Sequence, residues 1–181
     1  MIRAWKHFKT ITYHKYLVAK GCFRIGLYKQ GLLHDMSKYS PTEFLVGMKY
    51  YQGTRSPNNA EREVLGYSAA WLHHKGRNKH HYEYWQDYSV DSVDGALLPV
   101  PMPDRYFAEM IMDRIAASKV YKGKDYTDAS ALEYLYFRPD HKAVHPETAA
   151  QLEYVLKMLA EKGEEETFRY VKNRYVKHKK A

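Results

Sequence analysis

Apolar residues return every three or four positions along much of the chain. The clearest case runs from Ala4 to about Tyr28, where this spacing places the apolar residues on one face of a helix. Six further segments are predicted as helices: about 41–51, 59–75, 104–121, 127–137, 146–162 and 164–177. No segment shows the alternation of apolar and polar residues that is typical of a strand. The pattern therefore predicts an all-α protein.

Local signals set some of the boundaries. Ser40, Pro41 and Glu43 form a helix start, with Ser40 as the cap, Pro41 at the first helical position and Glu43 three residues after the cap. Glu43 could also orient a ligand, but we favour the capping role. Residues 86–103 contain one glycine and three prolines, so we predict a loop with at most a short turn.

Length and composition narrow the class of protein. A chain of 181 residues is close to one typical domain, so we expect a single compact helical domain over 1–181. The single cysteine, Cys22, excludes a disulfide framework and an all-cysteine zinc site, and we expect it to be a small core residue. No apolar run approaches the roughly 18 residues of a membrane span. We therefore expect a cytoplasmic protein that makes no membrane contact.

The net charge of +8 comes from the two ends of the chain. Residues 1–33 carry seven Lys or Arg and residues 169–181 carry six, and neither stretch contains an acidic residue. Such ends could bind nucleic acid or a phosphate-bearing ligand by electrostatic attraction. A solvated helix face and a frayed tail is the interpretation that we favour.

Histidines and aspartates with potential for metal chemistry follow one another in a suggestive order. His14 lies within the first predicted helix, and an adjacent pair, His34 and Asp35, follows it. Four histidines then fall within nine residues, at positions 73, 74, 80 and 81, and Asp113 lies inside a later helix. Imidazole and carboxylate ligands together suit Zn, Fe, Mn, Co or Ni, and carboxylates with water also admit Mg. The set therefore predicts one or two divalent metal ions.

Each of these residues also has a simpler interpretation. Asp35 could cap the following turn, and His14 could be an ordinary core or surface histidine. Asp113 could pair with Arg114 or Arg105. The aromatic residues of segment 82–85 could form a pocket that stacks on a base, but we favour packing within a helix turn. No role is assigned to the remaining histidines: His7, His141, His145 and His178.

The order of these residues resembles the HD-domain superfamily of metal-dependent phosphohydrolases, over about residues 14–119. Segment 32–38, Leu-Leu-His-Asp-Met-Ser-Lys, is similar to the family's His-Asp-x-Gly-Lys, with Ser37 in place of the glycine. The helix that begins Asp113-Arg-Ile-Ala-Ala resembles the family's closing aspartate helix. Segments 34–41 and 80–85 are also similar to a small bacterial family of uncharacterised function, which brings no known reaction with it.

The superfamily resemblance implies a ligand set. His14, His34, Asp35 and Asp113 would hold one ion, and His74 with His80 or His81 would hold a second, bridged by Asp35. Lys38 would contact a substrate phosphate. The implied catalytic residues are Asp35, Lys38 and Asp113. Four further residues are candidates for phosphate or base contacts by position alone: Lys75, Arg77, Asn78 and Lys119. The metal-site core would span about 10–122, followed by C-terminal helices at about 125–178.

The implied function is hydrolysis of a nucleotide or small phosphomonoester or phosphodiester by metal-activated water. Three alternatives stay open. The same scaffold could carry other metal chemistry, such as that of a di-iron oxygenase. The protein could instead be a helical nucleic-acid-binding protein that uses its basic ends, or a structural protein without turnover. A homodimer is also left open.

Overall fold

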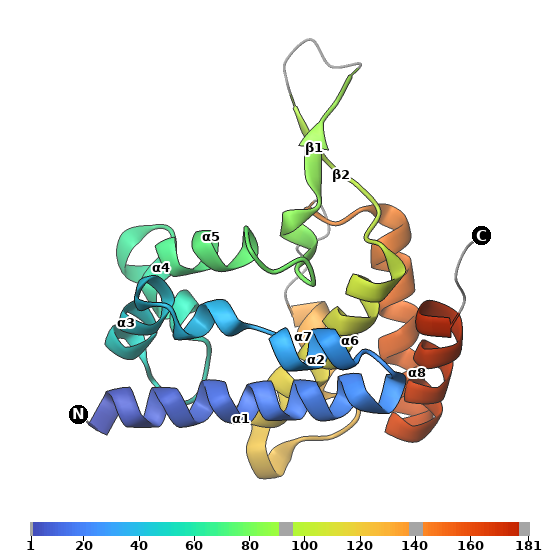
Figure 1. Cartoon of the computed structure of the whole chain (residues 1–181), viewed down its shortest axis with the longest axis horizontal. Coiled ribbons are helices and arrows are strands. Elements are labelled where there is room, and N and C mark those ends of the chain that lie inside the picture. Colours follow the sequence, from blue (N-terminus) through green and yellow to red (C-terminus); the bar gives the residue numbers. More distant parts are fainter. Residues whose placement is uncertain (1, 91–95, 138–142, 178–181) are drawn as a thin grey trace.

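Eight α-helices, a few short helical turns and one small hairpin make up the part of the chain that the structure describes. This computed structural model describes residues 2–90, 96–137 and 143–177 (Figure 1). The α-helices are α1 Ile2–Ile25, α2 Tyr28–Leu33, α3 Pro41–Tyr50, α4 Pro57–Leu65, α5 Ala69–Lys75, α6 Asp104–Lys122, α7 Ser130–Phe137 and α8 Pro146–Val171. The short turns are η1 Met36–Tyr39, η2 Tyr82–Tyr84, η3 Gly123–Asp125 and the π-helical η5 Lys172–Lys177. The all-α prediction is confirmed.

The hydrophobic core lies between α1, α6 and α8. Helix α1 buries one stripe of side chains at helical spacing, which changes from polar at its N-terminal part to apolar toward its end: His7, Ile11, His14, Val18, Cys22 and Ile25. The apolar part packs against buried residues of α6 and α8. Cys22 is fully buried there, as expected, and burial raises the pKa of its thiol. His14 thus lies on the face of α1 that looks into the protein.

A glycine allows α1 and α6 to approach closely. A Cβ atom added at Gly21 would lie 2.8 Å from the sulfur of Met112, so only a glycine fits without a shift of the methionine. Met112 directly precedes Asp113 in α6. The close approach of the two helices therefore helps to bring the polar side chains of both to one place.

Two of the predicted helices are interrupted by glycines. The first ends at Ile25 because Gly26 adopts a positive φ of 90°, and the chain then restarts as α2. The predicted helix 59–75 is two helices, α4 and α5, because Gly66 adopts a φ of 79°. Ser68 then caps α5 by accepting a hydrogen bond from the backbone N–H of Trp71. A predicted break near residue 163 is present as a kink inside α8, where Gly163 leaves the helical conformation.

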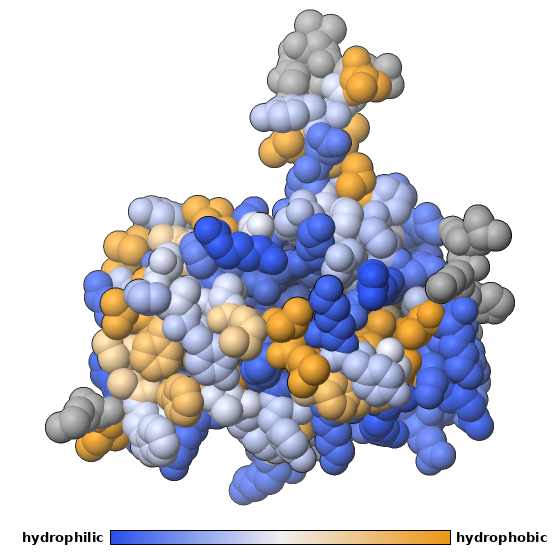
Figure 2. All heavy atoms as spheres, viewed as in Figure 1, coloured by the Kyte–Doolittle hydropathy of each residue, from blue (hydrophilic) through white to orange (hydrophobic). Residues whose placement is uncertain are grey.

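The predicted loop 86–103 contains two short strands, so the expectation of no strand was wrong. Strand β1 (Gln86–Tyr88) pairs in antiparallel fashion with β2 (Leu97–Pro99), and Asp87 lies opposite Leu98. Each strand has three residues, too few for an alternating pattern to stand out in the sequence. The hairpin projects from the helical body and exposes apolar residues (Figures 1 and 2).

Among the described residues, no helix is long and apolar enough to cross a membrane. The division into a metal-site core and a set of C-terminal helices stays a prediction.

Candidate metal centre

A turn between α2 and η1 directs two consecutive side chains into the protein. Asp35 has a φ of 53° and a ψ of 27°, and it is the only non-glycine residue with positive φ among those described. This left-handed conformation costs an aspartate of order 1 kcal/mol, and strain of this kind is often found at functional sites. Because of the turn, His34 and Asp35 are both buried, with 2% exposed surface each.

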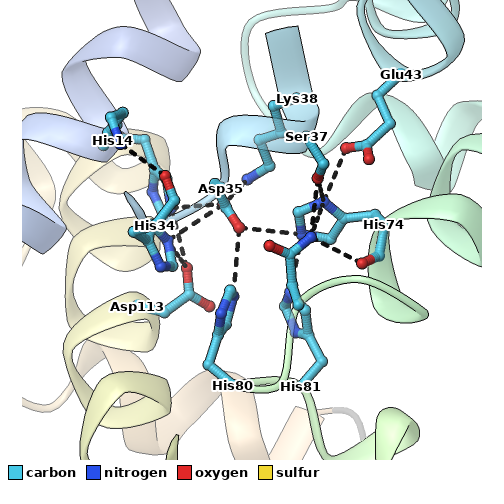
Figure 3. A network of polar contacts seen from close by, with 12 residues as sticks. His14, His34, Asp35, Ser37, Lys38, Glu43, His74, His80, His81 and Asp113 are labelled. Carbon is cyan, nitrogen blue, oxygen red and sulfur yellow. Dashed lines mark hydrogen bonds and ion pairs between the residues drawn. The ribbon is translucent and has the colours of Figure 1, made fainter. Parts of the chain in front are cut away.

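Three side chains gather on one side of Asp35, and together with it they form the first metal group: His14, His34, Asp35 and Asp113 (Figure 3). The Nε2 atom of His14 lies 2.9 Å from Oδ1 of Asp113 and 3.7 Å from Oδ2 of Asp35. The Nε2 atom of His34 lies 3.4 Å and 3.2 Å from the same two oxygens. Two imidazole nitrogens and two carboxylate oxygens therefore converge on one point.

Asp35 is shared with a second metal group: Asp35, His74, His80 and His81 (Figure 3). The other carboxylate oxygen of Asp35, Oδ1, lies 3.3 Å from Nε2 of His74 and 3.4 Å from Nε2 of His80. The Nε2 atom of His81 lies 2.9 Å from that of His74. The structure thus brings together all seven residues for which the sequence implied metal ligation.

The spacing of these atoms fits metal ions. Ligand atoms that bind one ion at about 2.0–2.2 Å lie roughly 3.0–3.5 Å from one another, which is close to most of the distances above. The Nε2 atoms of His14, His34 and His80 and both carboxylate oxygens of Asp35 are buried without a well-directed hydrogen bond. Buried polar atoms normally have partners, and a metal ion would supply them here.

Two glutamates hold the opposite nitrogens of three of these histidines. Oε1 of Glu109 lies 2.9 Å from Nδ1 of His34 and 3.2 Å from Nδ1 of His80. Oε2 of Glu43 lies 2.8 Å from Nδ1 of His74. A carboxylate at Nδ1 favours the tautomer that leaves the Nε2 lone pair for a metal ion, and such pairs are usual behind metal-binding histidines.

From the sequence, Glu43 had this role only as the less favoured alternative, and Glu109 was not assigned it. Glu43 was predicted to complete a helix cap, but Ser40 makes no side-chain capping hydrogen bond and Glu43 turns toward His73 and His74 instead. Glu109 was missed, although it lies four residues before Asp113 on the same face of α6. That i, i+4 spacing of two carboxylates was the available signal.

Ser37 helps to hold His74 in place. The side-chain amide of Asn78 donates hydrogen bonds to Oγ of Ser37, at 2.9 Å, and to the backbone carbonyl of His74, at 2.8 Å. These contacts tie η1 to the end of α5. The side chain of Asn78 therefore stabilises this part of the fold. Asn78 does not line the large cavity next to the metal groups.

The charges around Asp35 favour a cation. Burial raises the pKa of Asp35, but the charges of His34 and Lys38 outweigh burial and hold the pKa well below its usual value. Burial lowers the pKa of His34, yet Asp35, Asp113 and Glu109 outweigh it and raise the pKa well above the usual value. The surrounding carboxylates therefore stabilise a positive charge at His34. A bound metal ion can provide that charge in place of a proton.

Both metal groups border a cavity of about 1370 Å³. Lys38 lines it, and its Nζ atom lies 2.6 Å from Oδ2 of Asp35. Lys75, Arg77 and Lys119, which were predicted to bind substrate, do not line it. Lys119 pairs instead with Glu164 on α8. The cavity wall comes partly from α4, α7 and α8, and no pattern along the chain predicted this role for them.

Residues of segment 82–85 and the histidines outside the two metal groups differ in whether they line the cavity. Tyr82 lines the cavity, whereas Trp85 packs against Tyr106 with ring centroids 5.7 Å apart. His145 caps α8 by accepting a hydrogen bond from the N–H of Glu147, as a helix entrance does. His7 also lines the cavity, although no pattern in the sequence predicted this position. His141 and His178 lie outside the described residues.

The fold and the site define a mostly α-helical protein with a candidate centre for two metal ions. The chain belongs to a family of unknown function, DUF5662, whose family model matches residues 3–158. No curated protein and no solved structure matches the chain. The family match includes every residue of both metal groups, and it brings no reaction with it.

Proposed function

We propose that the protein is a metal-dependent phosphohydrolase of the HD type, which cleaves a nucleotide or a small phosphomonoester or phosphodiester. One observation carries the proposal. The two carboxylate oxygens of Asp35 face different histidine sets, with His14 and His34 near Oδ2 and His74 and His80 near Oδ1. A carboxylate in this position suits a bridge between two neighbouring ions, and pairs of ions about 3.5–4 Å apart are typical of enzymes that hydrolyse phosphate esters.

The ligand chemistry favours transition metals. Five imidazoles and two carboxylates suit Mn, Fe, Co, Ni or Zn better than Mg, which prefers oxygen ligands. Bound divalent ions supply Lewis-acid activation of a phosphoryl group and of the attacking water. The first metal group would hold one ion and the second metal group the other.

The residues of the chain prepare the site for this chemistry. Glu109 and Glu43 fix the rings of three histidine ligands, so that the Nε2 atoms need no reorientation. Lys38 lies between Asp35 and the cavity, where its ammonium group can neutralise the carboxylate and attract a phosphate. The cavity is large enough for a nucleotide or another compound of that size.

The first experiment is elemental analysis of the purified protein after loading with Mn, Fe, Co, Ni or Zn. We expect about two equivalents of metal in the wild type and none in the double variant Asp35→Asn plus Asp113→Asn. Asp128→Asn is the matched control, because Asp128 contacts Tyr126 and does not line the cavity. The loaded proteins are then incubated with nucleotides, phenyl phosphate and bis(p-nitrophenyl) phosphate.

We expect release of phosphate or p-nitrophenol that the double variant lacks. A loaded wild type that releases neither product from any of these esters overturns the phosphohydrolase proposal. Oxygen consumption by the iron-loaded protein would then favour the oxygenase alternative. A wild type that binds no metal under any loading condition removes the metal chemistry itself. Nucleic-acid binding that falls steeply with salt would then be the function to pursue.

A further inference from the structure

Arg114 lines the same cavity and follows directly on a residue of the first metal group. Its guanidinium carbon lies 5.9 Å from the ring centroid of Tyr82, which in turn follows His81 of the second metal group. The side chain therefore lies between parts of the chain that carry the two groups. Its Nε atom is buried and has no hydrogen-bond partner among the described residues.

Three other cations of the cavity wall have acidic partners, and a fourth, Arg62, donates a hydrogen bond to Oδ1 of Asn59. Nζ of Lys38 lies 2.6 Å from Asp35. Arg55 makes two hydrogen bonds to Glu63, of 2.5 and 2.6 Å, and Nζ of Lys122 lies 3.5 Å from Glu133. No ion pair joins Arg114 to an acidic side chain within the described parts of the chain, and in particular none joins it to Asp113.

A bound anion would give this buried Nε–H donor of Arg114 a partner. Burying a charged donor without a partner costs free energy, because the group gives up water and receives nothing in exchange. The alternative pairing with Asp113 is not formed, since the carboxylate of Asp113 faces His14 and His34. The planar guanidinium fork matches two oxygens of a phosphate or carboxylate, and an aromatic ring beside it favours a fixed orientation.

We propose that Arg114 binds the phosphoryl group of the substrate at the edge of the metal centre. This inference rests on the proposed function, which supplies the phosphate ester. Lys38 and Arg114 would then act from different elements, η1 and α6, on the same anion. Asp113 would hold metal while its neighbour in the sequence binds substrate, because consecutive side chains of a helix point in different directions.

The test is equilibrium binding of inorganic phosphate to the metal-loaded protein, measured by calorimetry and without turnover. We expect Arg114→Met to weaken phosphate binding by about 10- to 100-fold, and Arg114→Lys to lie between this variant and the wild type. Arg55→Met is the matched control. It removes the same charge from the same cavity wall, but its guanidinium is already bound to Glu63, so we expect less than about a twofold change.

Three results would overturn the inference. The first is equal phosphate affinity of Arg114→Met and the wild type at equal metal content. The second is wild-type binding of benzoate as tight as that of phosphate, which would contradict selection of a phosphoryl group. The third is a structural role of Arg114. In that case Arg114→Met would lower the thermal stability, Arg114→Lys would restore it, and the phosphate affinity of each variant would change in parallel with its stability.

The failure of the proposed function looks different. In that case no phosphate ester is turned over, yet phosphate still binds to the wild type and binds more weakly to Arg114→Met.

Discussion

The two metal groups share Asp35 but are built from different kinds of structure. The first metal group draws His14 and Asp113 from α1 and α6, helices of 24 and 19 residues that meet in the core. The second metal group draws His74 from α5, a helix of seven residues, and His80 and His81 from the segment that follows it. The first group is therefore an extension of the core, and the second is carried by a short peripheral segment.

The difference shows in what holds each group. Fully buried apolar side chains such as Val18 and Ile111 flank the first group on its helices. The second group depends more on polar contacts, from Glu43 to His74 and from Asn78 to Ser37, with one aromatic neighbour, Trp71. Packing is distributed over many atoms, whereas each polar contact depends on one partner. Single substitutions should therefore separate the two groups, and they should affect the second more readily.

The largest effect is expected at the residue that the groups share. Asp35→Asn removes a ligand from both, and the resulting amide is a poor metal ligand. We expect the affinity for both ions to fall by more than about 100-fold, beyond the 10- to 100-fold typical of residues behind the ligands. Competition titration with a chromophoric chelator measures both affinities. Retention of one ion at wild-type affinity would show that Asp35 is not a bridge.

Glu109→Gln is expected to weaken both groups, but less strongly. Glu109 contacts Nδ1 of His34, in the first group, and of His80, in the second. A neutral amide is a weaker acceptor than a carboxylate, so we expect about 10- to 100-fold lower affinity for each ion. The same chelator titration checks this. An effect on one ion alone would mean that only one of the two contacts orients a ligand.

Glu43→Gln should separate the groups. Glu43 contacts His74 of the second group and His73, which belongs to neither group. We expect about 10- to 100-fold weaker binding of one ion and less than about a twofold change for the other. Elemental analysis at limiting metal should then find close to one equivalent. Equal weakening of both ions would contradict the independence of the two groups.

The sequence predicted the helices and the clustering of the histidines and aspartates more completely than the surroundings of that cluster. Histidines and aspartates are rare enough in a cluster that their order alone indicated a metal site. Glutamates that orient ligands lack such a signature, because Glu43 and Glu109 also read as ordinary helix residues. The helix breaks at Gly26 and Gly66 were missed because they depend on tertiary packing. The hairpin was missed because its strands have too few residues to show an alternating pattern.

The cavity wall was the least predictable part. It combines residues of α1, α3, α4, α5, α6, α7 and α8, so the cations that line it can be identified only in the folded chain. Position near the histidines in the sequence suggested Lys75 and Arg77, whereas the fold brings Arg114 to the cavity. Nearness along the chain is a weak guide to a cavity formed between helices.

The smallest effect concerns two serines that both precede helices. Ser68 accepts a hydrogen bond from the N–H of Trp71 and donates one to buried Glu61, whereas Ser40 makes no capping bond. We expect Ser68→Ala to lower the free energy of unfolding by about 0.5–2 kcal/mol, and Ser40→Ala to change it by less than about 0.5 kcal/mol. Urea denaturation of the metal-free proteins compares them.

The same two serine variants also test whether the two metal groups are held independently. Ser68 begins α5, which carries His74. Loosening α5 should therefore weaken the ion of the second group, while the ion of the first group, held by α1 and α6, keeps its affinity. Equal costs for the two serines, or equal effects of Ser68→Ala on both ions, would show that α5 is held by packing rather than by its cap. The second group would then be as much a part of the core as the first.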